Sequence, residues 1–337
     1  MPKYSIQTIP YDTAAGDWNE LLSNSVNVSP FHHLEWLNAY SKAKGESFEI
    51  IGCYNENNEI VAGFAYFYRK KYGYKLIINL LGIDNHIIYR ERATKLQSKK
   101  ESYYFDIYEA INNYLDKNCN HIEYTLSYCH TDIRPFKWQG FKSEIRYTYI
   151  GDLTDTDTLL KNFNPDVRNK IKKALKLNYR FDCSNSAEEI LVSHQLIKRS
   201  LDKNSQAQVL DQEEYQTFCK LLHQAEMIKV CNIYNDETPV ATRVIIHNKN
   251  QAIDFQAGGN EAYFKTGLNQ LLSYKIFEML HQNNIGQYDF RGANTPTIAR
   301  YKSGFNFNLK PYYHIWKDKG LMFKAMLKTK ELIANVR

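Results

Sequence analysis

The sequence of 337 residues repeats one order of predicted helices and strands, and this repeat limits the folds open to the chain. A shift of 164 positions, the difference between 304 and 140, aligns Gly304-Phe305 with Gly140-Phe141, Tyr288 with Tyr124 and Tyr313 with Tyr149. Each copy reads helix, strand, short helix ending in Gly-Phe, then aromatic strand. Similarity at a fixed spacing indicates a duplicated unit, with chance matching of a few aromatic residues as the alternative. The sequence therefore predicts two mixed α/β domains, residues 1–150 and 151–337.

Hydrophobic periodicity agrees with an α/β assignment in both halves. In the first half, residues 98–118 carry apolar side chains at helical spacing, from Tyr104 and Ile107 to Leu115. In the second half, the segment that contains Leu268, Leu272 and Ile276 has the same stripe. Strands are predicted at 48–54, 60–68, 122–127, 144–151, 228–234, 240–247, 252–256, 288–290 and 312–316.

Composition places the chain among folded globular proteins, because 43% of its residues are hydrophobic and 24% are charged. No apolar run reaches about 18 residues and no leader pattern opens the chain, so we expect a cytoplasmic protein without a transmembrane segment. The six cysteines form no C-x-x-C pair and the histidines show no ligand spacing. We therefore expect reduced thiols and no metal site.

Three short motifs carry a family resemblance. They are Asn164-Pro165-Asp166-Val167-Arg168-Asn169-Lys170-Ile171-Lys172-Lys173-Ala174, Gly286-Gln287-Tyr288-Asp289-Phe290-Arg291-Gly292 and Ala299-Arg300-Tyr301-Lys302-Ser303-Gly304-Phe305. Their order resembles that of the Fem (FemABX-like) peptidyltransferases of the GNAT superfamily, which carry a basic "R-x-x-I-x-K-A" helix, a "Y-D-F-x-G" strand and an "F-K-x-x-F" turn. Tyr301 stands here where the family has the first Phe of that turn. The resemblance implies tandem GNAT-like domains without the long coiled-coil arm of some members, since no sustained heptad is present.

The resemblance implies an acyltransferase, for which Lys302 and Asp289 are the catalytic candidates. Lys302 matches the lysine of the late turn, where a cation would stabilise negative charge at the reacting carbonyl or on the leaving group. Its alternative is a solvated loop lysine. Asp289 alternates with Tyr288 and Phe290 along a strand, so it points to the opposite face and could accept a proton or bind the amine. Its alternative is a structural partner for Arg291 or Arg300.

The basic helix is the candidate site for an anionic substrate. Asn164 is its predicted N-cap and Pro165 its first residue. Arg168, Lys172 and Lys176 recur at a spacing of four, opposite an apolar stripe. We expect this face to bind phosphate, with a solvated basic helix as the alternative. The remaining predicted substrate-binding residues are Tyr301 and Arg291.

The donor should be acyl-CoA or aminoacyl-tRNA, with no tightly bound cofactor. A faithful GNAT pyrophosphate loop is missing from the sequence. In its place we assign Gly258, Gly259, Thr266 and Gly267, which precede a predicted helix whose first N–H groups could meet an anion.

These observations favour transfer of an acyl or aminoacyl group to an amine of a cell-wall or cell-surface precursor. One alternative is acyl-CoA-dependent N-acetylation of a sugar or small-molecule amine. Another is a non-enzymatic nucleic-acid-binding protein, for which the basic helix is the argument.

Overall fold

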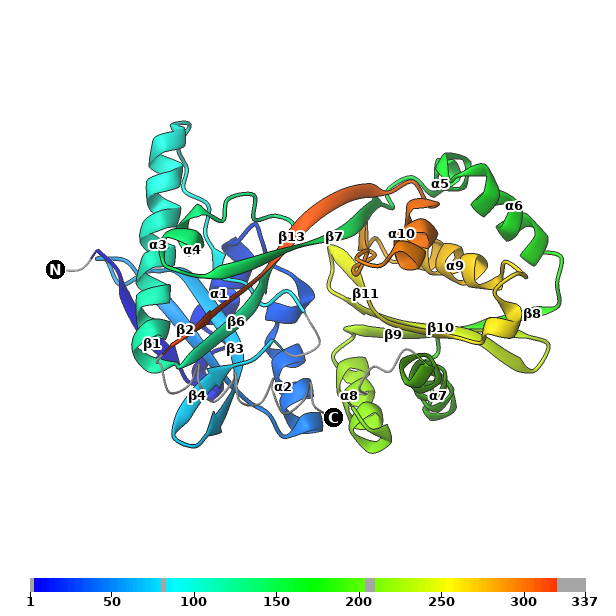
Figure 1. Cartoon of the computed structure of the whole chain (residues 1–337), viewed down its shortest axis with the longest axis horizontal. Helices are drawn as coiled ribbons and strands as arrows, with labels where there is room; N and C mark the ends of the chain where they lie inside the picture. The colour runs from blue at the N-terminus through cyan, green and yellow to red at the C-terminus, as the bar shows by residue number, and fades with distance from the viewer. Residues whose placement is uncertain (1–2, 80–82, 204–209, 320–337) are drawn as a thin grey trace, which may run out of the picture. The chain divides into compact units, whose positions relative to one another are not determined.

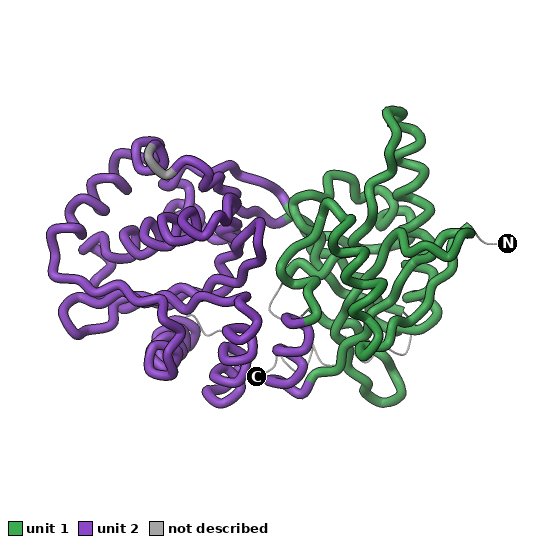
Figure 2. The backbone as a smooth tube through the Cα atoms, turned by 180° about the vertical axis from the view of Figure 1, so that it is seen from behind, with its two compact units in different colours: residues 1–34, 46–145, 312–337 green, residues 35–45, 146–311 purple. Residues whose placement is uncertain are grey.

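The computed structural model describes residues 3–79, 83–203 and 210–319. The chain divides into two compact units, shown in Figure 2. Unit 1 comprises residues 1–34, 46–145 and 312–337, and unit 2 comprises residues 35–45 and 146–311. Strands β7 (Lys142–Asp152) and β13 (Asn308–Asp318) each begin in one unit and end in the other.

Unit 1 contains a mixed sheet in the order β1-β2-β3-β4-β6-β13. Its other strands are β1 (Ser5–Ile9), β2 (Ser47–Tyr54), β3 (Ile60–Lys71), β4 (Tyr74–Ile77) and β6 (His121–Leu126), with β5 (Ile88–Tyr89) beside β3. Its helices are η1 (Tyr11–Thr13), α1 (Asp17–Asn24), η2 (Pro30–His32), α3 (Gln97–Asn118) and α4 (Arg134–Trp138). The β4–β6 contact is parallel, whereas the other neighbouring pairs up to β4 are antiparallel.

Both faces of the unit 1 sheet are covered. The stripe of α3 that the sequence predicts packs with Tyr124 and Ile315 in one hydrophobic core. On the other face α1 approaches the sheet at Gly63, where an added Cβ would lie 2.7 Å from the Trp18 ring. The glycine therefore allows helix and strand to pack closely.

In unit 2 the strand order is β7-β12-β11-β10-β9-β8, again with both parallel and antiparallel pairing. Its strands besides β7 are β8 (Tyr179–Asp182), β9 (Ile228–Asn235), β10 (Thr238–His247), β11 (Gln251–Gly259) and β12 (Gln287–Asp289). Its helices are α2 (Leu34–Lys44, in this unit from residue 35), α5 (Thr156–Asn162), α6 (Pro165–Ala174), α7 (Ala187–Lys203), α8 (Gln212–Gln224), η4 (Glu261–Tyr263), α9 (Leu268–Gln282) and α10 (Pro296–Ser303). In Figure 1, α5, α6, α9 and α10 lie on one side of this sheet, and α7 and α8 lie on the other.

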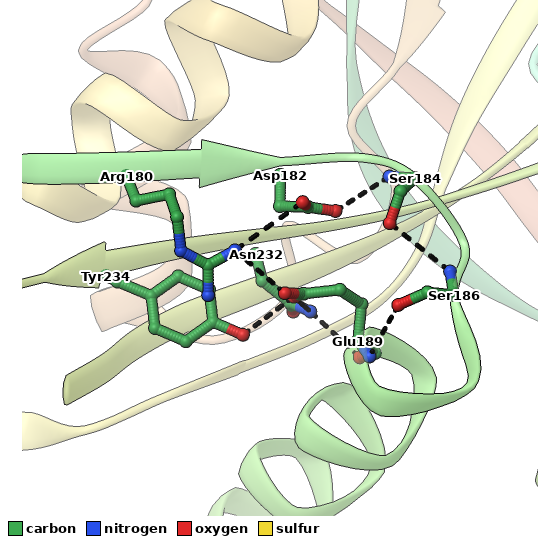
Figure 3. Close-up of polar contacts among 7 residues, drawn as sticks. All are labelled: Arg180, Asp182, Ser184, Ser186, Glu189, Asn232 and Tyr234. Atoms are coloured by element: carbon green, nitrogen blue, oxygen red, sulfur yellow. Dashed lines mark hydrogen bonds and ion pairs between the residues drawn. The ribbon is translucent and has the colours of Figure 1, made fainter. Parts of the chain in front are cut away.

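A buried carboxylate anchors α7 to the sheet of unit 2, as Figure 3 shows. Glu189 accepts hydrogen bonds from Arg180 Nη1 at 2.9 Å, Asn232 Nδ2 at 2.6 Å and the Tyr234 hydroxyl at 2.7 Å. Its backbone N–H donates to Ser186 Oγ. Because a buried carboxylate needs such partners, this cluster has a structural explanation.

The predicted duplication corresponds to two observed runs of elements. One is β6-α4-β7 and the other is β12-α10-β13. The aligned residues Tyr124 and Tyr288 are fully buried, as are Phe141 and Phe305 at the ends of the two short helices. In each run the last strand passes into the other unit, where β7 pairs with β12 and β13 pairs with β6.

Two cysteines do not fit the expectation of free thiols. Cys183 and Cys231 form a disulfide, so the prediction of six reduced cysteines is wrong for this pair. The reason is the antiparallel pairing of β8 with β9, which brings the two residues opposite each other. Within the described ranges, no helix is both long and apolar enough to cross a bilayer. Those ranges also contain no group of three or more His, Cys, Asp or Glu side chains arranged to hold a metal ion.

Three buried histidines of unit 1 form a cluster in which neighbouring rings meet edge to face. The ring centroids of His32 and His86 are 4.5 Å apart, and those of His86 and His130 are 4.6 Å apart. His86 Nδ1 and His130 Nε2 have no hydrogen-bond partner among the described residues. Burial lowers the pKa of His32 and His86 well below the ordinary value and that of His130 to about 4.

We predict that this histidine cluster makes the fold acid-sensitive. The pKa values of the three histidines are lower in the folded state than in the unfolded chain. Below about pH 6.5 the unfolded state therefore binds more protons, and the protein becomes less stable as the pH decreases. The slope of unfolding free energy should reach up to about 4 kcal/mol per pH unit if all three groups contribute. Urea denaturation of wild type and His130→Gln between pH 7.5 and 5 tests this. In the variant, the slope of unfolding free energy against pH should be smaller by the contribution of about one proton. Identical slopes in the two proteins would contradict the prediction.

Candidate functional site

Two neighbouring strands of unit 2 separate part of the way along their length. Strand β11 pairs in parallel with β12 only from Gln251 to Ile253, opposite Gln287 to Asp289. Beyond that point β11 continues to Gly259 beside β10, while β12 ends. The backbone between the diverging strands is therefore free of ladder pairing, and the residues where they separate are candidates for a site.

A left-handed turn follows β12 at this point. Arg291 has φ 47° and Gly292 has φ 42°, a backbone region that favours glycine and costs energy for arginine. Asp289 holds the start of the turn, because its Oδ1 accepts the Arg291 N–H at 2.7 Å and the Thr148 hydroxyl. Burial raises the pKa of Asp289, while these two hydrogen bonds act in the opposite direction.

Lys302 closes the same turn from α10. Its Nζ donates to the carbonyl oxygens of Phe290 at 2.6 Å, Arg291 at 2.5 Å and Gly292 at 3.3 Å. The residue is only 9% exposed, so the solvated-lysine alternative is wrong. Burial lowers the pKa of Lys302 to about 8. The three protons of the ammonium are matched by these three acceptors, which leaves none for a further hydrogen bond.

The two catalytic candidates are thus brought together on one turn, and the predicted binding residues Tyr301 and Arg291 lie there as well. The Tyr301 hydroxyl lies 2.9 Å from Ser273 Oγ and donates to the Asn269 carbonyl at 3.1 Å. Both partners belong to α9, so Tyr301 ties α10 to that helix. Arg291 is partly buried at the centre of the turn.

The basic helix α6 begins as predicted. Asn164 caps it by accepting the Asp166 N–H, and Pro165 is its first residue. Lys172 and Lys176 are exposed, but α6 ends at Ala174, so the prediction that Lys176 continues the basic face of the helix is wrong. Arg168 is half-buried and donates to the Lys161 carbonyl at 2.6 Å.

Helix α6 lies directly against the start of α9. A Cβ at Gly267, whose φ is 88°, would lie 2.3 Å from the Lys170 carbonyl oxygen. Thr266 accepts the Leu268 N–H at 3.3 Å and donates to Tyr263. Two of the predicted cofactor-binding residues therefore lie at a helix N-terminus, a position that favours phosphate, and there they pack against the backbone of α6.

The other two predicted cofactor-binding residues have a packing explanation. A Cβ at Gly258 would lie 2.5 Å from the backbone of Leu196 in α7, so glycine permits α7 to approach β11. The Gly259 N–H donates to Ser200 Oγ, also next to α7. These contacts lie on the α7 side of the sheet, and the structure does not bring Gly258 together with Gly267.

Sequence reasoning missed a buried ion pair beside the turn. Arg243 of β10 and Asp254 of β11 pair through Nη1 and Oδ2, with side chains only 5% and 4% exposed. The two residues are 11 positions apart and lie in segments that read as ordinary strands. The one available signal is charge inside otherwise apolar strand sequence, which usually marks a partner or a function.

The corresponding place in unit 1 is closed. Strands β4 and β6 pair only at Leu76 and His121. Beyond that pair, Asn79 Nδ2 donates to Thr125 Oγ1 at 2.5 Å, and Asn85 Oδ1 accepts the Thr125 N–H at 3.2 Å. Side chains from the segment that follows β4 thus bind β6 directly.

Comparison with known proteins relates this architecture to acyltransferases. Residues 161–303 match the family model described as an acetyltransferase (GNAT) domain. The crystal structure of FemX matches with TM-score 0.67 and 12% identity, over 92% of this chain and 96% of FemX. No curated protein sequence matches this chain.

Two further solved structures share the architecture. A tandem GNAT protein from the clavulanic acid biosynthesis pathway has TM-score 0.57 and 11% identity, over 94% of this chain and 99% of its own. The structure of L-PGS from Bacillus licheniformis has TM-score 0.54 and 12% identity, over 93% and 95%. At these identities the likeness shows the fold, which is the predicted pair of GNAT-like domains in tandem.

We predict that Lys302→Met lowers the stability of the folded chain. The change leaves three buried carbonyl oxygens without their donor, and the loss in unfolding free energy should be about 2 kcal/mol. Chemical denaturation measures it, with Lys310→Met as the control at an exposed lysine of β13. Equal stability of the two variants would show that the turn does not depend on Lys302.

Proposed function

We propose that this chain, a FemABX-like acyltransferase of the GNAT superfamily, transfers an acyl or aminoacyl group to the amine of a phosphate-bearing precursor, with its chemistry in unit 2. The observation that carries the proposal is the separation of β11 from β12, with Asp289 and Lys302 on the turn at its base. That arrangement lies inside residues 161–303, the segment that matches the acetyltransferase domain.

The reaction needs few chemical groups from the protein. A neutral amine nitrogen attacks the carbonyl carbon of the donor, the new C–N bond forms, and the bond to the thiolate or ribose oxygen breaks. The amine proton finally resides on the leaving group. The protein must hold the two reactants in line and stabilise the negative charge that develops on the carbonyl oxygen.

In this proposal Lys302 supplies a positive charge near the reacting carbonyl. Its hydrogen bonds to Phe290, Arg291 and Gly292 fix the ammonium in place, so the charge is preorganised before the donor arrives. Asp289 holds the Arg291 N–H and thereby the turn. The pair Asp289 and Lys302 thus sets the geometry at the separation point.

The basic face of α6 supports a phosphate-bearing substrate. Lys172 is exposed on a helix that contacts Gly267 at the N-terminus of α9, and Lys176 is exposed just after the end of that helix. Both features favour a phosphate or pyrophosphate group. A cell-wall precursor as acceptor follows from the resemblance to the Fem peptidyltransferases, whose acceptors belong to that class.

A second candidate function is acyl-CoA-dependent N-acetylation of a sugar or small-molecule amine. The description of the matching domain as an acetyltransferase favours it. The two candidates share one site and differ in donor and acceptor. We do not propose a non-enzymatic nucleic-acid-binding role, because the basic helix is part of the transferase domain.

Mass spectrometry of the acceptor tests the proposal and separates the candidates. The chain is incubated with UDP-linked muropeptide and either acetyl-CoA or aminoacyl-tRNA, and the acceptor is examined for the added acyl mass. Thermal shift with each donor runs in parallel. Stabilisation and transfer with acetyl-CoA alone would exclude the tRNA donor, whereas no transfer and no stabilisation with either donor would refute the proposal.

We predict that Lys172→Glu combined with Lys176→Glu weakens substrate binding without unfolding the chain. Both side chains are exposed, and reversing two charges beside a phosphate should raise KM about tenfold at low salt, with less effect at high salt. Steady-state kinetics at two ionic strengths measure this. Lys220→Glu on α8, at the opposite face of the sheet, is the control for a charge reversal. An unchanged KM would leave the basic face with a solvating role.

A further inference from the structure

The Arg243–Asp254 pair has features that folding alone does not explain. It lies between the adjacent strands β10 and β11 and is almost fully buried. Burying two charges is costly, and apolar residues of similar size often serve the fold equally well. Because of this cost, we looked for a role of the Arg243–Asp254 pair other than stabilising the fold.

The pair is also incompletely bonded. Arg243 Nε and Asp254 Oδ1 have no hydrogen-bond partner among the described residues, and the same holds for the neighbouring Tyr288 hydroxyl. Most buried polar atoms in folded proteins are satisfied.

The pair contacts the groups that surround Lys302. The Arg243 guanidinium carbon lies 5.4 Å from the ring centroids of both Phe290 and Tyr301. Phe290 begins the turn that Lys302 binds, and Tyr301 precedes Lys302 in α10. Lys302 Nζ itself lies 5.4 Å from the Phe290 centroid. Arg243 thus makes cation–π contacts with Phe290, which begins the turn, and with Tyr301, which precedes Lys302.

Charges from each neighbouring element act on Lys302. Asp254 of β11 and Asp289 of β12 raise its pKa, whereas Arg243 of β10 and Arg291 of the turn lower it. Asp254 and Arg243 are the strongest of these after burial. Asp254 therefore raises the pKa of Lys302 and Arg243 lowers it, so the effects of the two members of the pair offset each other.

We propose that Arg243 and Asp254 form a positioning pair for Lys302: Arg243 clamps Phe290 and Tyr301 around the lysine, and Asp254 offsets the positive charge that Arg243 brings. This inference rests on the proposed function, in which Lys302 provides the preorganised cation. Arg243 and Asp254 act through Lys302 in this inference and do not contact the substrate.

Direct titration of Lys302 tests the charge balance without a substrate. The intact chain is labelled with 13Cε-lysine, and the Lys302 resonance is identified by its loss in Lys302→Met. Arg243→Met should raise the midpoint and Asp254→Asn should lower it, each by about one pH unit. Glu189→Gln, in the buried cluster on the other face of the sheet, is the control and should leave the midpoint unchanged. Midpoints that stay at the wild-type value in both pair variants would overturn the inference.

A double variant protects the test against simple unfolding. Arg243→Met with Asp254→Leu replaces the pair with apolar side chains, and such replacements often preserve or raise stability. We expect a folded protein with turnover reduced at least tenfold and KM little changed. Full turnover in a folded double variant would overturn the positioning role, and so would a double variant that does not fold, because the pair would then be structural. By contrast, normal turnover of Lys302→Met would refute the role of Lys302 in the proposed function, whatever the titration shows.

Discussion

The bond between the Lys302 ammonium and three successive carbonyl oxygens is the interaction on which the site depends. It stabilises a turn with two left-handed residues, Arg291 and Gly292, directly after β12. That turn lies where β12 ends and its pairing with β11 stops. A buried cation held in this way supplies fixed charge without reorganisation during a reaction, which is the condition for strong electrostatic stabilisation.

Duplication gave the chain two similar units, but their diverging strands differ. In unit 1 the segment after β4 reaches β6 through Asn79 and Asn85, and both side chains bond to Thr125. In unit 2 the segment after β11 enters α9 through Gly267 instead, and α6 packs against that glycine. The two copies therefore keep one architecture with different interactions at the equivalent place. This asymmetry explains why we assign the chemistry to unit 2.

Local sequence signals predicted the elements well, because the stripe of α3, the Asn164-Pro165 start of α6 and the alternation at Tyr288-Asp289-Phe290 all depend on near neighbours. The tandem GNAT-like fold followed from the repeat and from the motifs. The burial of Lys302, the Arg243–Asp254 pair and the Cys183–Cys231 disulfide did not, because each depends on packing between separate elements. Gly258 shows the same limit, since its contact with Leu196 in α7 leaves no local signal.

The proposed chemistry requires the donor to bind where β11 and β12 separate in unit 2. Hydrogen exchange of the intact chain, measured by mass spectrometry with and without the donor that supports turnover, locates this site. We expect slower exchange in residues 254–259, 266–271 and 290–296 when the donor is bound, and no change in residues 83–90 of unit 1. Protection confined to unit 1 would contradict it, and the catalytic assignment would then belong to the other copy.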